Sequence, residues 1–86
     1  DNASVGVSAR SVIEKVIERN AVSVVISHNH PTGHALPSKD DISTTQKIQN
    51  VLASMSIRLI DHVIISNEDD DCISMSQTED FQYIFK

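Results

Sequence analysis

The sequence predicts an α/β fold of the α+β type, in which a mixed β-sheet is flanked by helices. Apolar residues recur at helical spacing in residues 9–17 and again in residues 38–55. Residues 22–27 and 57–66 are instead continuous runs rich in Val and Ile, as in strands. This alternation indicates helices layered on a sheet. With 86 residues, the chain can form one small domain, residues 1–86.

The first helix has two candidate N-caps. Ser8 can cap it directly, whereas Ser11 would form a capping box with Glu14. Asn20 suits the left-handed conformation that often ends a helix. Residues 1–7 are expected to be the end of a strand or an extended entry segment. The apolar stripe of the helix consists of Ala9, Val12, Ile13, Val16 and Ile17.

The middle of the chain holds the two main strands and the second helix. The strand at 22–27 has apolar residues on both faces, which is typical of a central strand covered on both sides. A loop with both prolines of the chain follows it. The strand at 57–66 could bend at Asp61–His62. The second helix begins at Ser38, and its apolar stripe consists of Ile42, Ile48, Val51, Leu52 and Met55.

The last twenty residues complete the fold. The acidic run at 68–71 is expected to be a solvated hairpin tip. Residues 72–75 would return as a short strand, and residues 79–85 would form a short helix or an extended cap. The aromatic residues, which should close one end of a core of Val, Ile and Leu, are Phe81, Tyr83 and Phe85.

Charge and cysteine content exclude several classes of function. The formal net charge is −5, and the seven basic residues are scattered, which argues against direct nucleic-acid binding. The single cysteine, Cys72, is expected to be a small buried hydrophobic residue in a reducing environment. With no apolar stretch long enough to span a bilayer and no signal peptide, we expect a cytoplasmic protein.

Two histidines and one aspartate stand out as candidate metal ligands. His28 and His30 lie two residues apart at the end of a strand, so both imidazoles should point to one face. Asp41 follows in the first turn of the second helix. Two imidazoles and a carboxylate, with a fourth position left for water, form a three-ligand site for a divalent cation, which is the ligand count of a catalytic rather than a structural metal.

Each of these residues also has a purely structural explanation. Ser38 and Asp41 fit the Ser-x-x-Asp pattern of a capped helix, in which the helix dipole favours the aspartate. A histidine at the end of a strand is often only hydrogen-bonded. The joint occurrence of all these residues at fixed spacing is what favours a metal site.

The spacing His28-x-His30-x7-Ser38-x2-Asp41 resembles the JAMM (MPN-plus) metalloprotease motif. The stretch 28–33 is similar to the RadC-like branch of JAB domains, as are residues 2–4, Arg10 and residues 57–65.

The resemblance implies a cytidine-deaminase-like JAB/MPN architecture and a zinc-dependent hydrolase. His28, His30 and Asp41 would bind the zinc ion, and Ser38 would be catalytic, either holding the bound water or stabilising the oxyanion. The metal-activated water would attack a peptide or isopeptide-like amide in a peptide or protein substrate.

The sequence departs from the family pattern in one respect. The JAMM pattern includes a general-base glutamate on an early strand upstream of the paired histidines, and this chain starts too late to include it. Glu14 and Glu18 lie on the expected first helix and are explained by its solvent-facing side. We therefore expect an N-terminally incomplete domain that binds metal but turns over substrate poorly.

Three neighbouring polar residues are not expected to be metal ligands. His34 lies in the loop and is expected to face solvent, and Asp40 should point elsewhere on the helix. His62 follows Asp61, as in the family, and is expected to make a structural hydrogen bond or to orient a ligand.

Two other functions are alternatives to the hydrolase. One is a DNA-repair-associated factor, after the association that gave the RadC family its name; a salt-sensitive complex with DNA would favour it. The other is a protein-binding module without turnover. Exposed sheet edges could also pair with a second copy of the chain to form a homodimer.

Overall fold

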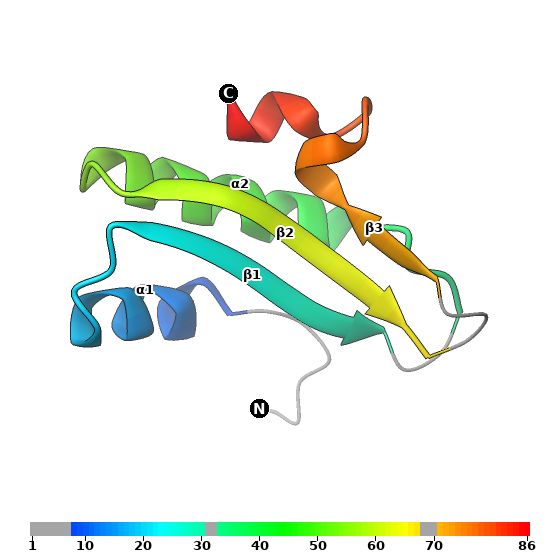
Figure 1. Cartoon of the computed structure of the whole chain (residues 1–86), viewed down its shortest axis with the longest axis horizontal. Coiled ribbons are helices and arrows are strands. Elements are labelled where there is room, and N and C mark those ends of the chain that lie inside the picture. Colours follow the sequence, from blue (N-terminus) through cyan, green and yellow to red (C-terminus); the bar gives the residue numbers. More distant parts are fainter. Residues whose placement is uncertain (1–7, 31–32, 68–70) are drawn as a thin grey trace.

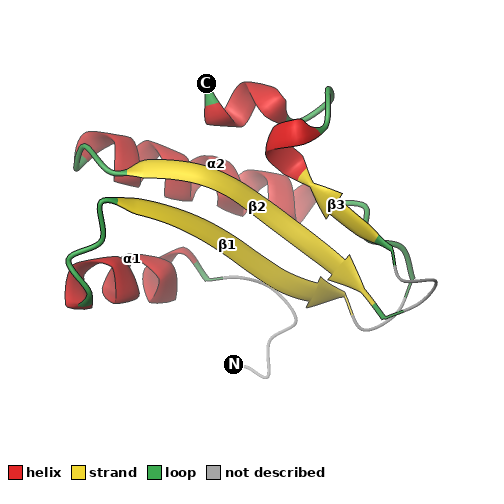
Figure 2. Ribbon diagram, in the orientation of Figure 1, coloured by secondary structure: helices red, strands yellow, loops and turns green. Residues whose placement is uncertain are grey.

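Two helices pack against one face of a three-stranded sheet in the computed structural model, which describes residues 8–30, 33–67 and 71–86 (Figures 1 and 2). The helices are α1 (Ala9–Glu18) and α2 (Lys39–Ser54). The α+β class expected from the sequence is confirmed. The expectations for residues 1–7 and for most of the acidic run lie outside the described residues.

The sheet is mixed, with strand order β1-β2-β3. Strand β1 (Ser23–His30) pairs in parallel with β2 (Arg58–Ser66), and β2 pairs antiparallel with β3 (Cys72–Ser74). Helix α2 makes the crossover that two parallel neighbours require (Figure 1).

Strand β1 lies at an edge of the described sheet, which corrects the expectation of a central strand covered on both faces. Ile26 is buried under the helices, whereas the Val25 side chain on the other face is 57% exposed. Apolar residues on both faces therefore do not mark a doubly covered strand in this part of the chain.

Both helices begin at a capping serine. Ser8, rather than Ser11, is the N-cap of α1, because its side chain accepts a hydrogen bond from the Ser11 main-chain N–H. Ser38 caps α2 in a reciprocal capping box with Asp41. Asn20 follows α1 with a φ of 51°, as expected for the residue that ends a helix.

The apolar core has two clusters. The first joins α1, α2, β1 and β2 and consists of Val16, Ile26, Ile48, Leu52 and Leu59. The second lies toward β3 and the C-terminus and consists of Ala35, Ile64, Met75 and Ile84.

Several residues of the expected stripes are exposed. Ile17 on α1, Val51 on α2 and Met55, the C-cap of α2, keep 38–59% of their surface exposed. Thr45, which no apolar pattern could include, is fully buried on the inner face of α2.

The C-terminal region contains less regular secondary structure than the sequence predicts. Two 3₁₀ turns, Met75–Gln77 and Gln82–Phe85, follow β3. Phe85 packs against both core clusters, whereas Tyr83 is 59% exposed. Cys72 is exposed, because it opens the short edge strand β3, so the expectation of a buried thiol is wrong.

Candidate metal centre

The carboxyl ends of β1 and β2 and the start of α2 lie on the same side of the molecule (Figure 1). On β1, inward and outward residues alternate, and His28 and His30 share the inner face with Ile26. Asp41 is in the first turn of α2 and is 7% exposed. The topology therefore brings two imidazoles and one carboxylate to one place.

The three side chains contact one another directly. His30 Nε2 lies 3.0 Å from Asp41 Oδ2, and His28 Nε2 lies 3.4 Å from Asp41 Oδ1. One potential ligand atom from each residue lies within 4.8 Å of the other two. In a tetrahedral zinc site with ligand bonds of about 2.0–2.1 Å, neighbouring ligand atoms are about 3.4 Å apart. Each imidazole–carboxylate distance is therefore close to that in such a site, and the set as a whole is somewhat wider.

The Asp41 carboxylate is held in place by the helix start. The Ser38 main-chain N–H donates to Asp41 Oδ2 at 2.8 Å, and the Asp41 N–H donates to Ser38 Oγ at 3.0 Å. Burial alone would raise the pKa of the Asp41 carboxyl, but these contacts with Ser38 and the two nearby imidazoles outweigh burial and lower it. Asp41 is therefore ionised at neutral pH, as a metal ligand must be.

His62 lies directly behind His28. Its Nε2 is 2.7 Å from His28 Nδ1, and its Nδ1 is 2.7 Å from Thr45 Oγ1. Burial, followed by the proximity of His28, lowers the pKa of His62 to about 4. Burial also lowers the pKa of His28, although the Asp41 carboxylate opposes this. Both rings are therefore neutral at pH 7 in the absence of a ligand.

A β-bulge turns His62 toward this cluster. Val24 pairs with Leu59, but Val25 pairs with Asp61, so Ile60 is an extra residue in β2. The buried residues of β2 therefore run from Leu59 to His62, three positions apart, instead of following simple alternation. The irregularity that the sequence placed at Asp61–His62 lies one residue earlier.

The loop before α2 orients the second imidazole. His30 Nδ1 lies 3.1 Å from the main-chain oxygen of His34, whose own side chain is 83% exposed. The Ala35 N–H donates to Asp71 Oδ2, which ties this loop to the turn before β3. Asp71 is therefore not simply part of a solvated tip. Gly33 adopts a φ of +80° in this loop, which favours glycine.

The chemistry of the cluster fits a cation. A carbonyl oxygen can only accept, so His30 carries a proton on Nδ1, and His30 Nε2 is hydrogen-bonded to Asp41 Oδ2 at 3.0 Å. His28 Nε2 is buried and has no hydrogen-bond partner among the described residues. Two imidazole nitrogens and a buried carboxylate thus converge, with one of the two nitrogens unpartnered, and a divalent cation could take one ligand atom from each residue.

The sequence anticipated the three converging residues and a hydrogen-bonding role for His62, but not the other supporting partners. The structure places Ser38 at their edge as an N-cap, and Asp40 is exposed. Thr45 and the His34 carbonyl were missed. Thr45 could have been found, because it lies four residues after Asp41 on one helix face and interrupts an apolar stripe.

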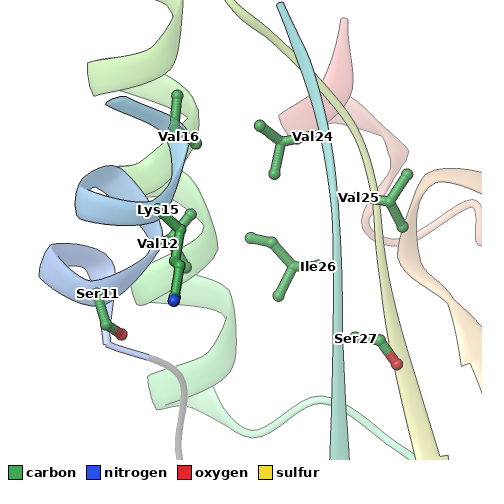
Figure 3. Close-up of a pocket in the computed structure, with 8 residues that line it drawn as sticks. All are labelled: Ser11, Val12, Lys15, Val16, Val24, Val25, Ile26 and Ser27. Carbon is green, nitrogen blue, oxygen red and sulfur yellow. The ribbon is translucent and has the colours of Figure 1, made fainter. Parts of the chain in front are cut away.

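A separate groove lies between α1 and β1 (Figure 3). Val24 and Ile26 point toward α1, and Val25 points away from it. Lys15 is the one titratable group among the described residues that line the groove. Within the described ranges, no helix combines the length and apolarity needed to cross a membrane.

Known proteins resemble this chain across most of its length. The model of the RadC-like JAB domain matches residues 1–80. A UPF0758 protein of Photobacterium profundum is 38% identical over 74 residues, which cover 86% of this chain and 32% of that protein. UPF0758 proteins of Shewanella frigidimarina and Shewanella baltica are 38% and 36% identical over 66 residues, which cover 77% of this chain and 29% of each relative.

The chain thus spans 29% to 32% of the length of these curated relatives. The match to the family model covers both histidines, the start of α2 and all three strands. The chain belongs to the family of RadC-like JAB domains.

Proposed function

We propose that this chain carries the metal centre of a zinc-dependent hydrolase of the JAMM type, which cleaves a peptide or isopeptide-like amide. The observation that carries the proposal is the cluster of His28, His30 and Asp41, whose potential ligand atoms lie within 4.8 Å of one another, with His28 Nε2 buried and unpartnered among the described residues.

Each residue of the site has a defined task. His28, His30 and Asp41 would hold the ion and leave a fourth position open. Zinc bound there would supply Lewis-acid chemistry and lower the pKa of a bound water toward about 7.

Ser38 is well placed to assist in catalysis. Its Oγ accepts the Asp41 N–H, so its own hydroxyl proton is not used in the cap. We propose that Ser38 uses this proton in a hydrogen bond that holds the attacking water or stabilises the developing oxyanion.

A proton acceptor for the attacking water must come from elsewhere. Glu14 and Glu18 are exposed on α1 and do not belong to the ligand cluster. We propose that a glutamate outside the described residues takes that role.

Zinc binding tests the proposal directly. Isothermal titration with Zn²⁺, combined with elemental analysis, should give one ion per wild-type chain. Asp41→Asn and His30→Ala should bind none tightly. Asp40→Asn is the matched control, because Asp40 is the exposed neighbour of Asp41 in the same helical turn. Equal zinc uptake by Asp41→Asn and by the wild type would refute the metal centre.

Hydrolysis is tested on the full-length protein. With zinc bound, the wild type should cleave an amide-linked protein substrate, and Ser38→Ala should lower kcat by about 10²–10³-fold, as removal of an oxyanion donor does elsewhere. If the zinc-loaded full-length protein cleaves none of a panel of peptide and isopeptide substrates, the proposed hydrolase activity is contradicted, whereas the metal site is not.

The outer face of the sheet favours a second candidate function, the binding of a protein partner or a second copy. Val25, Ile60 and Ile65 are 42–57% exposed on the face away from the helices, and β1 is an edge strand of the described sheet. Sedimentation of the chain should then show self-association that Val25→Lys weakens. A monomer at high concentration would exclude the homodimer.

A further inference from the structure

We propose that His62 and Thr45 form a hydrogen-bond relay that fixes the tautomer of His28, so that His28 Nε2 presents its lone pair to the metal centre before an ion arrives. His62 is then a positioning residue, which acts through His28. The relevance of the relay to zinc rests on the function proposed above, whereas the tautomer itself does not.

The direction of hydrogen-bond donation along the relay is set by Thr45, the member most distant from His28. Thr45 Oγ1 lies 2.6 Å from the main-chain oxygen of Asp41 and 2.7 Å from His62 Nδ1. The carbonyl oxygen has no proton, so the single hydroxyl proton of Thr45 must be donated to it. Thr45 Oγ1 therefore accepts from His62, and His62 carries its proton on Nδ1.

The next link follows from the burial of His62. Its ring is fully buried, and no carboxylate in the described ranges forms an ion pair with it. Asp61 bonds instead to the His62 main-chain N–H and to Ser74. A doubly protonated ring here would be an unpaired buried charge, so the ring has one proton and its Nε2 is an acceptor.

The last hydrogen bond of the relay, between His62 and His28, fixes the tautomer of His28. His62 Nε2 lies 2.7 Å from His28 Nδ1, so His28 must donate from Nδ1. Its Nε2 is then an unprotonated nitrogen, 3.4 Å from Asp41 Oδ1. The relay starts at one proposed ligand and ends on the main chain of another, with its members on β1, β2 and α2.

Both histidines of the cluster donate from Nδ1, but to different kinds of acceptor. His30 donates from Nδ1 to a main-chain carbonyl in a loop, whereas His28 donates to a side chain within the sheet. Orientation by a side chain can be removed by mutation, and removal of such an outer partner typically weakens metal binding about 10–100-fold.

The reverse tautomer is the competing arrangement. A proton on His28 Nε2 would point toward Asp41 and form an ordinary buried hydrogen bond, with no preformed metal site. Heteronuclear NMR of ¹⁵N-labelled imidazoles distinguishes the two in metal-free protein. We expect the Nδ1–H form of His28 in the wild type, and an Nε2–H signal would overturn the proposal.

Substitutions at position 62 test the positioning role. His62→Leu removes the acceptor and should lower the affinity for Zn²⁺ about 10–100-fold, with His28 becoming a mixture of tautomers. His62→Gln can place an amide oxygen near the position of Nε2 and should restore most of the affinity. Wild-type Zn²⁺ affinity in a folded His62→Leu chain, checked by circular dichroism, would overturn the role.

Thr45 provides a second pair of test variants in case substitutions at position 62 prevent folding. Thr45→Ser retains the hydroxyl and should behave as the wild type, whereas Thr45→Val breaks the far end and should loosen the tautomers of both histidines. Equal behaviour of the two variants would contradict the relay. Failure of the wild type to bind Zn²⁺, with His28 still in the Nδ1–H form, would refute the zinc proposal and leave the relay in place.

Discussion

The two ends of the layer formed by β1, β2 and α2 are equally buried but chemically opposite. At one end the inward residues are Ile26 on β1, Leu59 on β2 and Leu52 on α2. At the other end the same elements present His28, His62 and Thr45 together with Asp41. One set of backbone elements thus carries both an apolar core and a polar cluster.

This difference separates stability from chemistry. Apolar burial contributes about 25 cal/mol per Å² without any requirement for partners. Polar burial is costly unless each group is hydrogen-bonded, and at this site the described side chains are hydrogen-bonded except at His28 Nε2. The apolar end should therefore stabilise the fold, and the polar end should be retained for its ligand.

The largest expected effect is a loss of stability caused by a substitution in the apolar end. Leu52→Ala removes a fully buried side chain and should lower the free energy of unfolding by about 2–5 kcal/mol, measured in urea. The neighbouring Val51, on the outer side of the same helix, is 42% exposed, and Val51→Ala should cost less than about 1 kcal/mol. Zinc affinity should be unchanged in whatever fraction of Leu52→Ala remains folded; a large loss would show that the two ends are coupled.

The next effect concerns pH at the polar end. The pKa of His62 is lowered to about 4 and that of His28 is also lowered, so between pH 6.5 and 4 the unfolded chain binds more protons than the folded one. The metal-free protein should therefore lose stability as the pH falls through this window, by at most about 1.4 kcal/mol per pH unit for each histidine.

Urea unfolding in a chelator at several pH values measures this slope. His62→Gln should flatten it, whereas His34→Gln, which alters an exposed ring, should leave it unchanged. An unaltered slope in His62→Gln would mean that the buried histidine is not the group that takes up the proton. Below about pH 4, the lowered pKa values of Asp41 and Asp61 add a further loss of stability as the carboxylates are protonated.

The sequence predicted the elements and the three converging residues because the signals are local. A period of two along a strand places His28 and His30 on one face, and a capping pattern starts the helix that carries Asp41. The position of the loop between them then follows from chain connectivity.

The parts that the sequence did not predict depend on long-range register. Whether β1 is central or at an edge is decided by which strands pair with it. The exposure of Cys72 likewise depends on the position of β3 at the other edge of the described sheet. The bulge at Ile60 turns His62 inward, and no local pattern marks it. Main-chain acceptors such as the His34 carbonyl are independent of residue type.

A smaller effect is expected in the loop that orients His30. Gly33→Ala puts an L side chain at a φ of +80°, in open space, and should cost about 1 kcal/mol through backbone strain alone. Because the loop positions the His34 carbonyl, zinc affinity should fall as well. His34→Ala, which keeps that carbonyl and removes an exposed ring, should change neither quantity. If His34→Ala weakens zinc binding as much as Gly33→Ala does, the side chain rather than the carbonyl is involved.

The smallest effect lies far from the polar end, at the start of α1. Ser8 accepts the Ser11 N–H at 3.3 Å, a long hydrogen bond at an exposed site, so Ser8→Ala should cost about 0.5 kcal/mol, near the lower end for an N-cap. Ser11→Ala should be close to neutral, because the Ser11 hydroxyl bonds only to an exposed carbonyl, that of Ser8. Thermal unfolding of the two variants distinguishes the caps. A larger loss in Ser11→Ala would instead favour the capping box with Glu14, and neither variant should alter zinc affinity, because α1 provides none of the three ligands.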